Sequence, residues 1–469
     1  MNATLRALNR FGLGARVGER HAIDDPRAWL RSQLQGDAPV VRIPAGATPA
    51  AISDAVRAFR TLGQASQQER QQARRQLVAI AAAESRAALT QRATSDRPFV
   101  ERLVAFWSNH LCVSSGAKIL IAPLAGSYER EGIRPYVLGR FEDMVLASAK
   151  HPAMLVYLDN FQSIGPGSRG ARLGRGRQQR GLNENYAREL LELHTLGVNG
   201  GYTQQDVQEL AKILTGWTVG GLVRAGAMQN ARPRARRRQP MQMRQDPAAP
   251  IGFAFQELLH EPGSKTVLSV RYSEAGVAEG ERAIRALCRH RSTAQFIATK
   301  LVTHFVADEP PAPAVDRIAQ TFRDTEGDLR AVAGALIDLP EAWDGSLRKF
   351  RAPQDWLVAV LRVFNAAEAS ERMMPLLRQL RHPLWSPQAP KGFGDSTQEW
   401  AGPDSLLNRA ELARTVARRL RAQQIDPRTL LDAVDINAGD PLHGLLADNS
   451  IPADERIALA LAGPAFQWR

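Results

Sequence analysis

The stretch "NENYARELLELHTLG", Asn183 to Gly197, gathers amides and carboxylates within a few helical turns. On an α-helix each residue advances by about 100°, so with Asn185 at zero Glu189 lies near 40° and Glu192 near 340°, roughly on one face. Two carboxylates held side by side in a cleft raise the pKa of one of them, which creates an acid/base pair. We therefore predict Glu189 and Glu192 as candidate catalytic residues.

Further polar side chains flank this face and could position a substrate: Asn183, Glu184, Asn185 and Arg188. A simpler interpretation is a solvated face that holds an Arg188–Glu192 pair, worth a few tenths of a kcal/mol. His194 falls on the opposite, apolar side at about 180°, where we expect a core histidine bonded to a carbonyl. The helix therefore lacks the Glu-x-x-His metal motif of bundle proteins. Both interpretations of the polar face stay open.

Two other segments offer groups for acid/base chemistry. In "FVERLVAFWSNHL", His110 lies on the apolar stripe beside Trp107, either as a core histidine or as a base or ligand in an apolar pocket. Asn109, which precedes it, is a candidate for substrate binding. In "HEPGSKT", a Pro-Gly turn presents His260 and Lys265, which we add to the catalytic candidates.

Motifs with a defined chemistry are missing from the sequence. There is no GxxxxGK[ST] phosphate loop, no H-E-x-x-H, no paired CxxC and no G-x-S-x-G. "GLGARVG" lacks a preceding strand, so we reject it as a dinucleotide site. The two cysteines, Cys112 and Cys288, lie in apolar helical contexts and predict buried thiols. The sequence thus identifies no metal and no cofactor.

The net charge of +13 comes almost entirely from two segments. Residues 168–180 hold five arginines and residues 223–245 hold seven, with no acidic residue in either. We expect flexible loops that could attract an anionic surface or polymer. They lack the interleaved aromatics of single-strand binders, so we expect no specific nucleic acid. No apolar run reaches the roughly 18 residues of a membrane helix, so an integral membrane protein is not expected.

Helical periodicity dominates the rest of the chain and predicts an all-α fold. Helices are expected at 65–92, 97–111, 134–150, 276–289, 293–307, 313–323, 328–338, 353–367 and 403–421. "GSKTVLSVRYS" is the best candidate for a short strand or hairpin. We divide the chain into a helical lobe at 1–218, a basic insertion at 219–248 and a second helical lobe at 249–469, with the lobes packed as one domain. A Pro/Gly/Trp-rich loop, 381–402, is too apolar for a linker and is expected to pack on the surface.

Several segments resemble a bacterial family catalogued as domain of unknown function 1800. They include "LNRFGLG", "HPAMLVYLDN", "NENYARELLELHTLGVNGGYTQQDV", "LAKILTGWT", "HEPGSKTVLS", "FIATKLVTHFVAD" and the closing "PAFQW". The resemblance implies a protein often exported and often encoded beside another family of unknown function, number 1501, whose members resemble sulfatases or phosphatases. This chain departs from the family pattern in its longer Arg-rich loops, in Glu261 where relatives carry Asp, and in lacking a signal peptide.

Two functions are compatible with these observations. The first is an enzyme with hydrolase or transferase-like acid/base chemistry on an anionic or glycan-type substrate. The second is a non-catalytic helical scaffold or escort for a sulfatase-like partner, the partner being implied by the resemblance. From the sequence as given we expect a cytoplasmic protein, with a periplasmic or exported location as the alternative that the resemblance implies.

Overall fold

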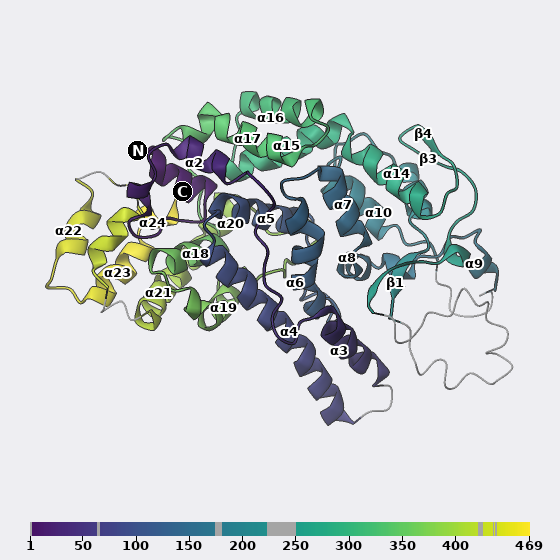
Figure 1. Ribbon diagram of the computed structural model, residues 1–469, viewed down its shortest axis with the longest axis horizontal. Helices are drawn as coiled ribbons and strands as arrows, with labels where there is room; N and C mark the ends of the chain where they lie inside the picture. Colours follow the sequence, from purple (N-terminus) through teal and green to yellow (C-terminus); the bar gives the residue numbers. More distant parts are fainter. Residues whose placement is uncertain are drawn as a thin grey trace.

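The computed structural model describes residues 2–62, 66–173, 181–222, 250–420, 425–434, 436 and 439–469. Its architecture is all-α, as predicted (Figure 1). The α-helices are α1 (Ala3–Arg6), α2 (Pro26–Ser32), α3 (Pro49–Thr61), α4 (Gln67–Thr94), α5 (Pro98–His110), α6 (Ala125–Ser127), α7 (Phe141–Lys150), α8 (Pro152–Tyr157), α9 (Arg169–Leu173), α10 (Asn185–Glu189), α11 (Gln204–Ile213), α14 (Val277–Cys288), α15 (Arg291–Phe305), α16 (Ala312–Asp324), α17 (Leu329–Asp338), α18 (Pro353–Val363), α19 (Ser370–Gln379), α20 (Thr397–Trp400), α21 (Pro403–Arg419), α22 (Pro441–Ala447), α23 (Ala453–Ala462) and α24 (Pro464–Gln467).

Two antiparallel ribbons accompany the helices. Strands β3 (Lys265–Val267) and β4 (Val270–Tyr272) form the hairpin that the sequence predicted. The other ribbon pairs β1 (Trp217–Gly220) with β2 (Gly252–Phe255) and was not foreseen. Its strands flank the basic segment 223–245, which lies outside the described residues. Because the two strands are far apart in the sequence, no contiguous stretch shows a hairpin pattern.

Local signals in the sequence explain where several helices begin and end. Ser66 and Glu69 form a capping box at the start of α4, and Thr203 and Asp206 form another at the start of α11. These reciprocal bonds satisfy backbone N–H groups that the first helical turn leaves without partners. Gly197 has the left-handed conformation (φ +82°) expected of a residue that ends a helix.

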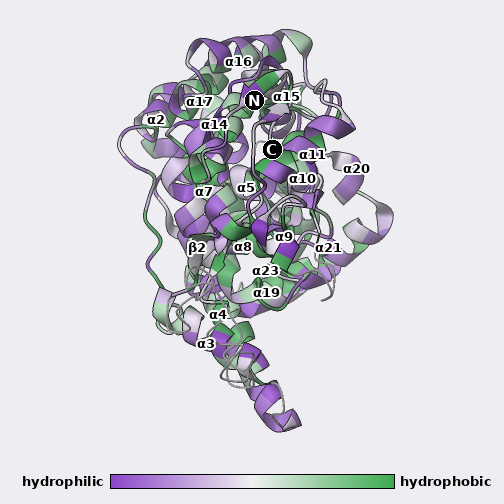
Figure 2. Ribbon diagram, turned by 90° about the vertical axis from the view of Figure 1, so that its right-hand side faces the viewer, coloured by the Kyte–Doolittle hydropathy of each residue, from purple (hydrophilic) through white to green (hydrophobic). Residues whose placement is uncertain are grey.

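The hydrophobic core consists of two clusters. The first joins helices from α2 to α17 and includes elements on both sides of the 219–248 segment. The second is built by α18, α19 and the C-terminal helices together with residues near the N-terminus. Trp29 and Trp385 pack against both clusters, so they mark the junction. Helices α3 and α4 extend from the body as a projecting pair whose tip is hydrophilic (Figures 1 and 2).

The N-terminal segment fastens the two clusters together. Phe11 packs on Phe99, Phe305 and Trp343 of the first cluster. Gly14 (φ +114°) lies against α18, where an added Cβ would come within 2.7 Å of the Ala359 methyl group, so only glycine fits. The "GLG" motif is therefore a packing element and not a nucleotide site. No helix in the described part of the chain is long and apolar enough to span a bilayer.

Candidate functional site

The helix that carries the predicted acidic pair changes its geometry halfway. α10 ends at Glu189, and residues Leu190–His194 form a π-helical turn. Single π turns inside helices rotate the following side chains relative to an α-helix. The expectation of one regular α-helix across Asn183–Gly197 was therefore wrong in detail. Thr195 helps to close this turn, since its hydroxyl donates to the Leu190 carbonyl oxygen at 2.6 Å.

The polar face of this helix is half-buried and is tied into a ladder of side chains. Arg188 lies 3.4 Å from Glu184 and 3.6 Å from Glu192, and its guanidinium donates to Gln204 at 2.9 Å. Burial raises the pKa of Glu189, and the charge of Glu192 raises it further while Arg188 lowers it. The perturbed carboxyl thus exists, but neither glutamate lines the cavity between α5 and α15 that is described below.

The amides at the start of this helix have structural partners. The Asn183 side chain accepts the Asn185 N–H at 2.9 Å, so it caps the first turn. The Asn185 side-chain amide donates to the Leu158 carbonyl oxygen at 3.4 Å, and that of Asn183 donates to Asp159 at the same distance. These contacts hold α10 against the end of α8.

His260 and Lys265 belong to a separate buried cluster with Glu279. The ring nitrogen Nε2 of His260 lies 3.1 Å from Glu279 Oε2, and Lys265 Nζ lies 3.3 Å from the same oxygen. His260 Nδ1 donates to the Thr215 carbonyl oxygen at 2.9 Å. All three side chains are at most 3% exposed, so no substrate reaches them in this conformation.

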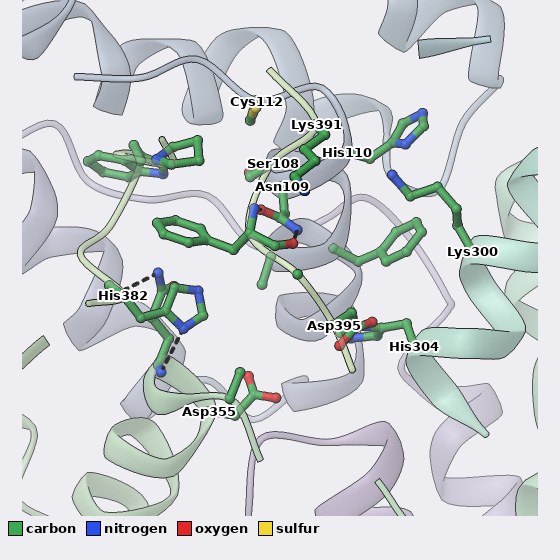
Figure 3. A pocket seen from close by; sticks show the side chains of 18 of the residues that line it. Ser108, Asn109, His110, Cys112, Lys300, His304, Asp355, His382, Lys391 and Asp395 are labelled. Carbon is green, nitrogen blue, oxygen red and sulfur yellow. Dashed lines mark hydrogen bonds and ion pairs between the residues drawn. The ribbon is translucent and has the colours of Figure 1, made fainter. Parts of the chain in front are cut away.

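A cavity with both apolar and polar walls lies at the junction of the two core clusters. It has a volume of about 290 Å³ and lies between α5, α15, the start of α18 and the loop 380–396 (Figure 3). Substrate sites commonly lie at such junctions and combine apolar walls with a few convergent polar groups. The loop, predicted to pack on the surface, instead forms one wall, with eight lining residues: His382, Leu384, Trp385, Pro387, Lys391, Phe393, Gly394 and Asp395.

An imidazole–carboxylate pair spans this cavity. His304 on α15 donates its Nδ1–H to Asp395 Oδ2 at 2.6 Å. The opposite nitrogen, Nε2, is shielded from solvent and has no hydrogen-bond partner among the described residues. Burial lowers the pKa of His304, although Asp395 raises it. Burial alone would raise the pKa of Asp395, but His304, Lys349 and Arg469 lower it. The pair is therefore a neutral imidazole oriented by an ionised carboxylate.

Asp355 is the other acidic residue that lines the cavity. Its Oδ2 accepts from Arg102 at 2.8 Å and lies 3.6 Å from Arg469 Nε. Burial would raise the pKa of Asp355, but the two arginines lower it far below its usual range. The carboxylate thus stays ionised and charge-balanced, so it cannot serve as a proton donor near neutral pH.

The lysines divide sharply by position. Of the seven lysines in the chain, five form ion pairs with carboxylates: Lys118, Lys150, Lys212, Lys265 and Lys349. The other two, Lys300 and Lys391, line the cavity and have no hydrogen bond or ion pair with any residue that the structure describes. Burial lowers the pKa of Lys300, which lies one helical turn before His304. The Lys300 ammonium lies 5.5 Å from the centroid of the Phe296 ring but has no carboxylate partner among the described residues, so an anionic ligand in the cavity would supply its counter-ion.

The end of α5 fixes the loop wall. The Asn109 side chain donates to the Phe393 carbonyl oxygen at 2.9 Å and accepts the Phe393 N–H at 2.8 Å. Gly392 is left-handed (φ +80°), and an added Cβ would lie 2.4 Å from the Asn109 carbonyl oxygen. The Cys112 thiol donates to the Pro390 carbonyl oxygen at 3.1 Å, and burial raises its pKa to about 12. Asn109 is therefore a clamp for the loop, and Cys112 is no thiolate nucleophile.

His110 combines both roles that the sequence left open. Its Nε2–H donates to the His194 carbonyl oxygen at 3.1 Å, as a core histidine would, and the residue also lines the cavity. Its Nδ1 has no partner among the described residues. Burial and the nearby Lys300 charge lower its pKa and that of His194, the latter to about 3. Figure 3 shows the Lys300 side chain extending toward the His110 ring. His194 is buried as expected, although its ring Nε2 is unpaired.

Of the ten residues predicted for the site, only Asn109 and His110 line the cavity. The structure places the other eight elsewhere: Glu189, Glu192, Asn183, Glu184, Asn185 and Arg188 on the α10 face, and His260 and Lys265 in the Glu279 cluster. Sequence inspection missed His304, Lys300, Lys391, Asp355 and Asp395. A usable signal was the Lys-x-x-x-His spacing in "ATKLVTHF", which puts both side chains on one helical face. Among described residues, no group of three or more His, Cys, Asp or Glu side chains could hold a metal ion.

Comparison with known proteins gives the family but no functional precedent. No curated protein and no solved structure matches the chain. The sequence profile of one family, described as a protein of unknown function (DUF1800), matches residues 6–468. The match confirms the resemblance in the sequence and covers every element that builds the cavity. The chain is a member of the DUF1800 family.

Proposed function

We propose that the protein is an enzyme whose active site is the cavity at the junction of the two core clusters. One observation carries this proposal: a carboxylate-oriented imidazole and an unpaired ammonium lie one turn apart on α15 and line the same cavity. Imidazoles oriented in this way are general bases, because the carboxylate fixes the tautomer and stabilises the imidazolium that forms. The supported chemistry is acid/base catalysis of hydrolysis or group transfer on an anionic substrate.

The residues of the cavity have different roles in this proposal. His304 takes a proton at Nε2 from a substrate hydroxyl or a water while Asp395 balances the new positive charge. Nε2 is enclosed, so this step needs a small displacement of the cavity wall when substrate binds, as commonly occurs when sites tighten around a substrate. Lys300 and Lys391 hold the anionic group. Asn109 acts as a positioning residue, since it holds the loop that carries Asp395.

A panel of chromogenic substrates tests the proposal. Nitrophenyl glycosides, uronides, phosphates, sulfates and esters are offered to the wild-type chain and to His304→Gln. We expect turnover of at least one anionic member, and a loss of about 10²-fold or more in His304→Gln. His21→Gln is the matched control, because His21 is exposed and far along the chain from the cavity residues. If His304→Gln keeps full turnover and has the same melting temperature as the wild-type chain, the proposal is contradicted.

The scaffold function stays a prediction from the sequence, as do the sulfatase-like partner and the compartment. If His304→Gln has no effect but deletion of 223–245 abolishes co-purification with a sulfatase-like protein, the escort function is favoured.

A further inference from the structure

The cavity differs from a simple anion site in its other walls. Three aromatic side chains line it: Phe106, Trp385 and Phe393. Aromatic faces pack against the C–H faces of a ring, while polar groups at the edges fix its orientation. The volume of about 290 Å³ is large enough for a ligand of about a dozen heavy atoms. The space therefore fits one six-membered polar ring.

Two carboxylate oxygens remain available in the same cavity. Asp395 uses Oδ2 for His304, and Asp355 uses Oδ2 for Arg102. The second oxygen of each has no hydrogen bond to any residue in the described ranges. Both groups are ionised, so each free oxygen acts only as an acceptor. A ligand that fills this space must bring donors, and hydroxyl groups are such donors.

The charge balance separates an acidic ligand from a zwitterionic one. Asp355 is bonded to Arg102, and Asp395 lies near the cationic groups of Lys349 and Arg469, so both acids are balanced by protein groups. Lys300 and Lys391 are not. An amino acid would place its ammonium beside these two cations, whereas the carboxylate of a hydroxylated acid would neutralise one of them without adding a positive charge.

The donors favour a carboxylate over a phosphate. Phosphate sites usually offer several N–H donors, from a helix N-terminus, a glycine-rich loop or a forked arginine. Here the free cationic donors are the two ammonium groups, and Arg92, which also lines the cavity, is bonded to Glu129 at 2.7 Å. A dianion would also lie close to the Asp395 and Asp355 carboxylates. A single negative charge fits this arrangement better.

We infer that the cavity binds a uronic-acid unit, with its carboxylate on Lys300, its ring against Trp385 and Phe393, and its hydroxyls on Asp355 and Asp395. This inference names the substrate class of the proposed active site and rests on that proposal for its catalytic meaning. The binding itself does not require catalysis, so the two are tested separately.

Titration calorimetry on the full chain tests the inference with four probes: sodium D-glucuronate, D-glucose, sodium acetate and inorganic phosphate. Glucose keeps the ring and lacks the carboxylate, and acetate keeps the carboxylate and lacks the ring. We expect saturable binding of glucuronate, with each of the other three at least about tenfold weaker. Glucose or phosphate that binds as tightly as glucuronate, or glucuronate that does not bind at all, overturns the inference.

Variants locate the binding. Lys300→Met should weaken glucuronate binding by about tenfold or more, because it removes a charge-assisted hydrogen bond and keeps the length of the side chain. Lys212→Met is the matched control, since Lys212 pairs with Glu209 away from the cavity, and should bind as wild type does. Should Lys300→Met fail to fold, Lys391→Met tests the same inference at an exposed position and should also weaken binding. Unchanged affinity in a folded Lys300→Met variant, or in Lys391→Met when it replaces that variant, overturns it.

Failure of the inference and failure of the proposed function give different results. If glucuronate does not bind but His304→Gln loses turnover of another anionic substrate, the active site stands and the ligand class is wrong. If glucuronate binds and Lys300→Met weakens it while His304→Gln turns over normally, the ligand class stands and the catalytic role of His304 is wrong.

Discussion

His304 and Asp395 lie 91 residues apart in the chain, and their side chains meet at 2.6 Å in the wall of the cavity. His304 comes from a regular helix and Asp395 from a loop without secondary structure. Such a pair depends on the loop being held in place, which is the task of the Asn109 clamp at Phe393. The geometry of the His304–Asp395 pair therefore depends on the Asn109–Phe393 contact, which has no chemical role of its own.

Asn109→Ala should release this clamp. Two hydrogen bonds to the Phe393 backbone are lost, so we expect the Phe393 amide to exchange with solvent at least about tenfold faster, equivalent to one lost bond of about 1 kcal/mol. Turnover should fall with it. Asn109→Asp is the informative companion, because it keeps the acceptor for the Phe393 N–H and loses the donor. If exchange at Phe393 is unchanged in Asn109→Ala, the loop is held by other contacts.

Lys265→Met tests the cluster around Glu279. The change removes the ammonium and leaves the fully buried Glu279 carboxylate in contact with the His260 ring alone, so we expect a loss of about 3 kcal/mol in the free energy of unfolding. Urea unfolding followed by circular dichroism measures it. Turnover per folded molecule should equal that of wild type, since the cluster is not part of the cavity. A stable Lys265→Met protein without activity would instead place this cluster in the reaction.

Glu189→Gln separates the helix-face hypothesis from the cavity proposal. Glutamine keeps the shape and removes the repulsion from Glu192, so stability should stay within a few tenths of a kcal/mol of wild type. The cavity proposal expects full turnover, because Glu189 does not line the cavity. A folded variant with abolished turnover would restore the α10 face as the catalytic surface.

Stability should depend on pH through three buried histidines. Burial lowers the pKa of His151, His194 and His382 to about 3 in the folded chain, against an ordinary value of 6.5. Above pH 6.5 neither state is protonated and the three contribute no pH dependence. Between pH 6.5 and about 3 only the unfolded chain takes up protons, so the free energy of unfolding falls by roughly 1 kcal/mol per histidine for each pH unit. Urea unfolding at several pH values measures this slope.

His151→Asn provides the control for that slope. His151 caps α8 by accepting the Ala153 N–H at 3.1 Å, and asparagine is a good cap. The variant should therefore fold and should lose about one third of the acid slope that these three histidines produce. A slope identical to that of wild type would show that His151 is protonated in the folded state.

Much of the fold follows from local sequence signals. The helices at 97–111, 293–307 and 403–421 were predicted within a few residues of α5, α15 and α21, because 3.6-residue periodicity marks all three and a first-turn proline also marks the start of α5 and α21. The capping box at Thr203 and the β3–β4 hairpin were equally local. The β1–β2 ribbon was not, because its strands are joined through a long segment that carries no strand pattern.

Most residues of the site could not be predicted from such local signals. His110 and Asn109 were found because they lie on a clear amphipathic helix, but their partners come from α15 and from a loop that offers no periodicity. The acidic pair on the α10 segment was predicted because polar side chains are dense there. In the structure that face is occupied by the ion pairs of Arg188 with Glu184 and Glu192. The more specific signal was the rarity of lysine. The chain has seven lysines, and Lys300 lies four residues before a histidine, a spacing that places both side chains on one face of a helix.

The pH dependence of kcat/KM on the best anionic substrate tests the role of His304 most directly. Burial lowers the pKa of His304 below its ordinary 6.5, so the neutral base is present at neutral pH and is lost on acidification. We predict that kcat/KM rises with pH through an apparent pKa below 6.5, and that this acid limb disappears in His304→Gln together with most of the turnover. An acid limb of the same midpoint and full turnover in a folded His304→Gln enzyme would contradict the account.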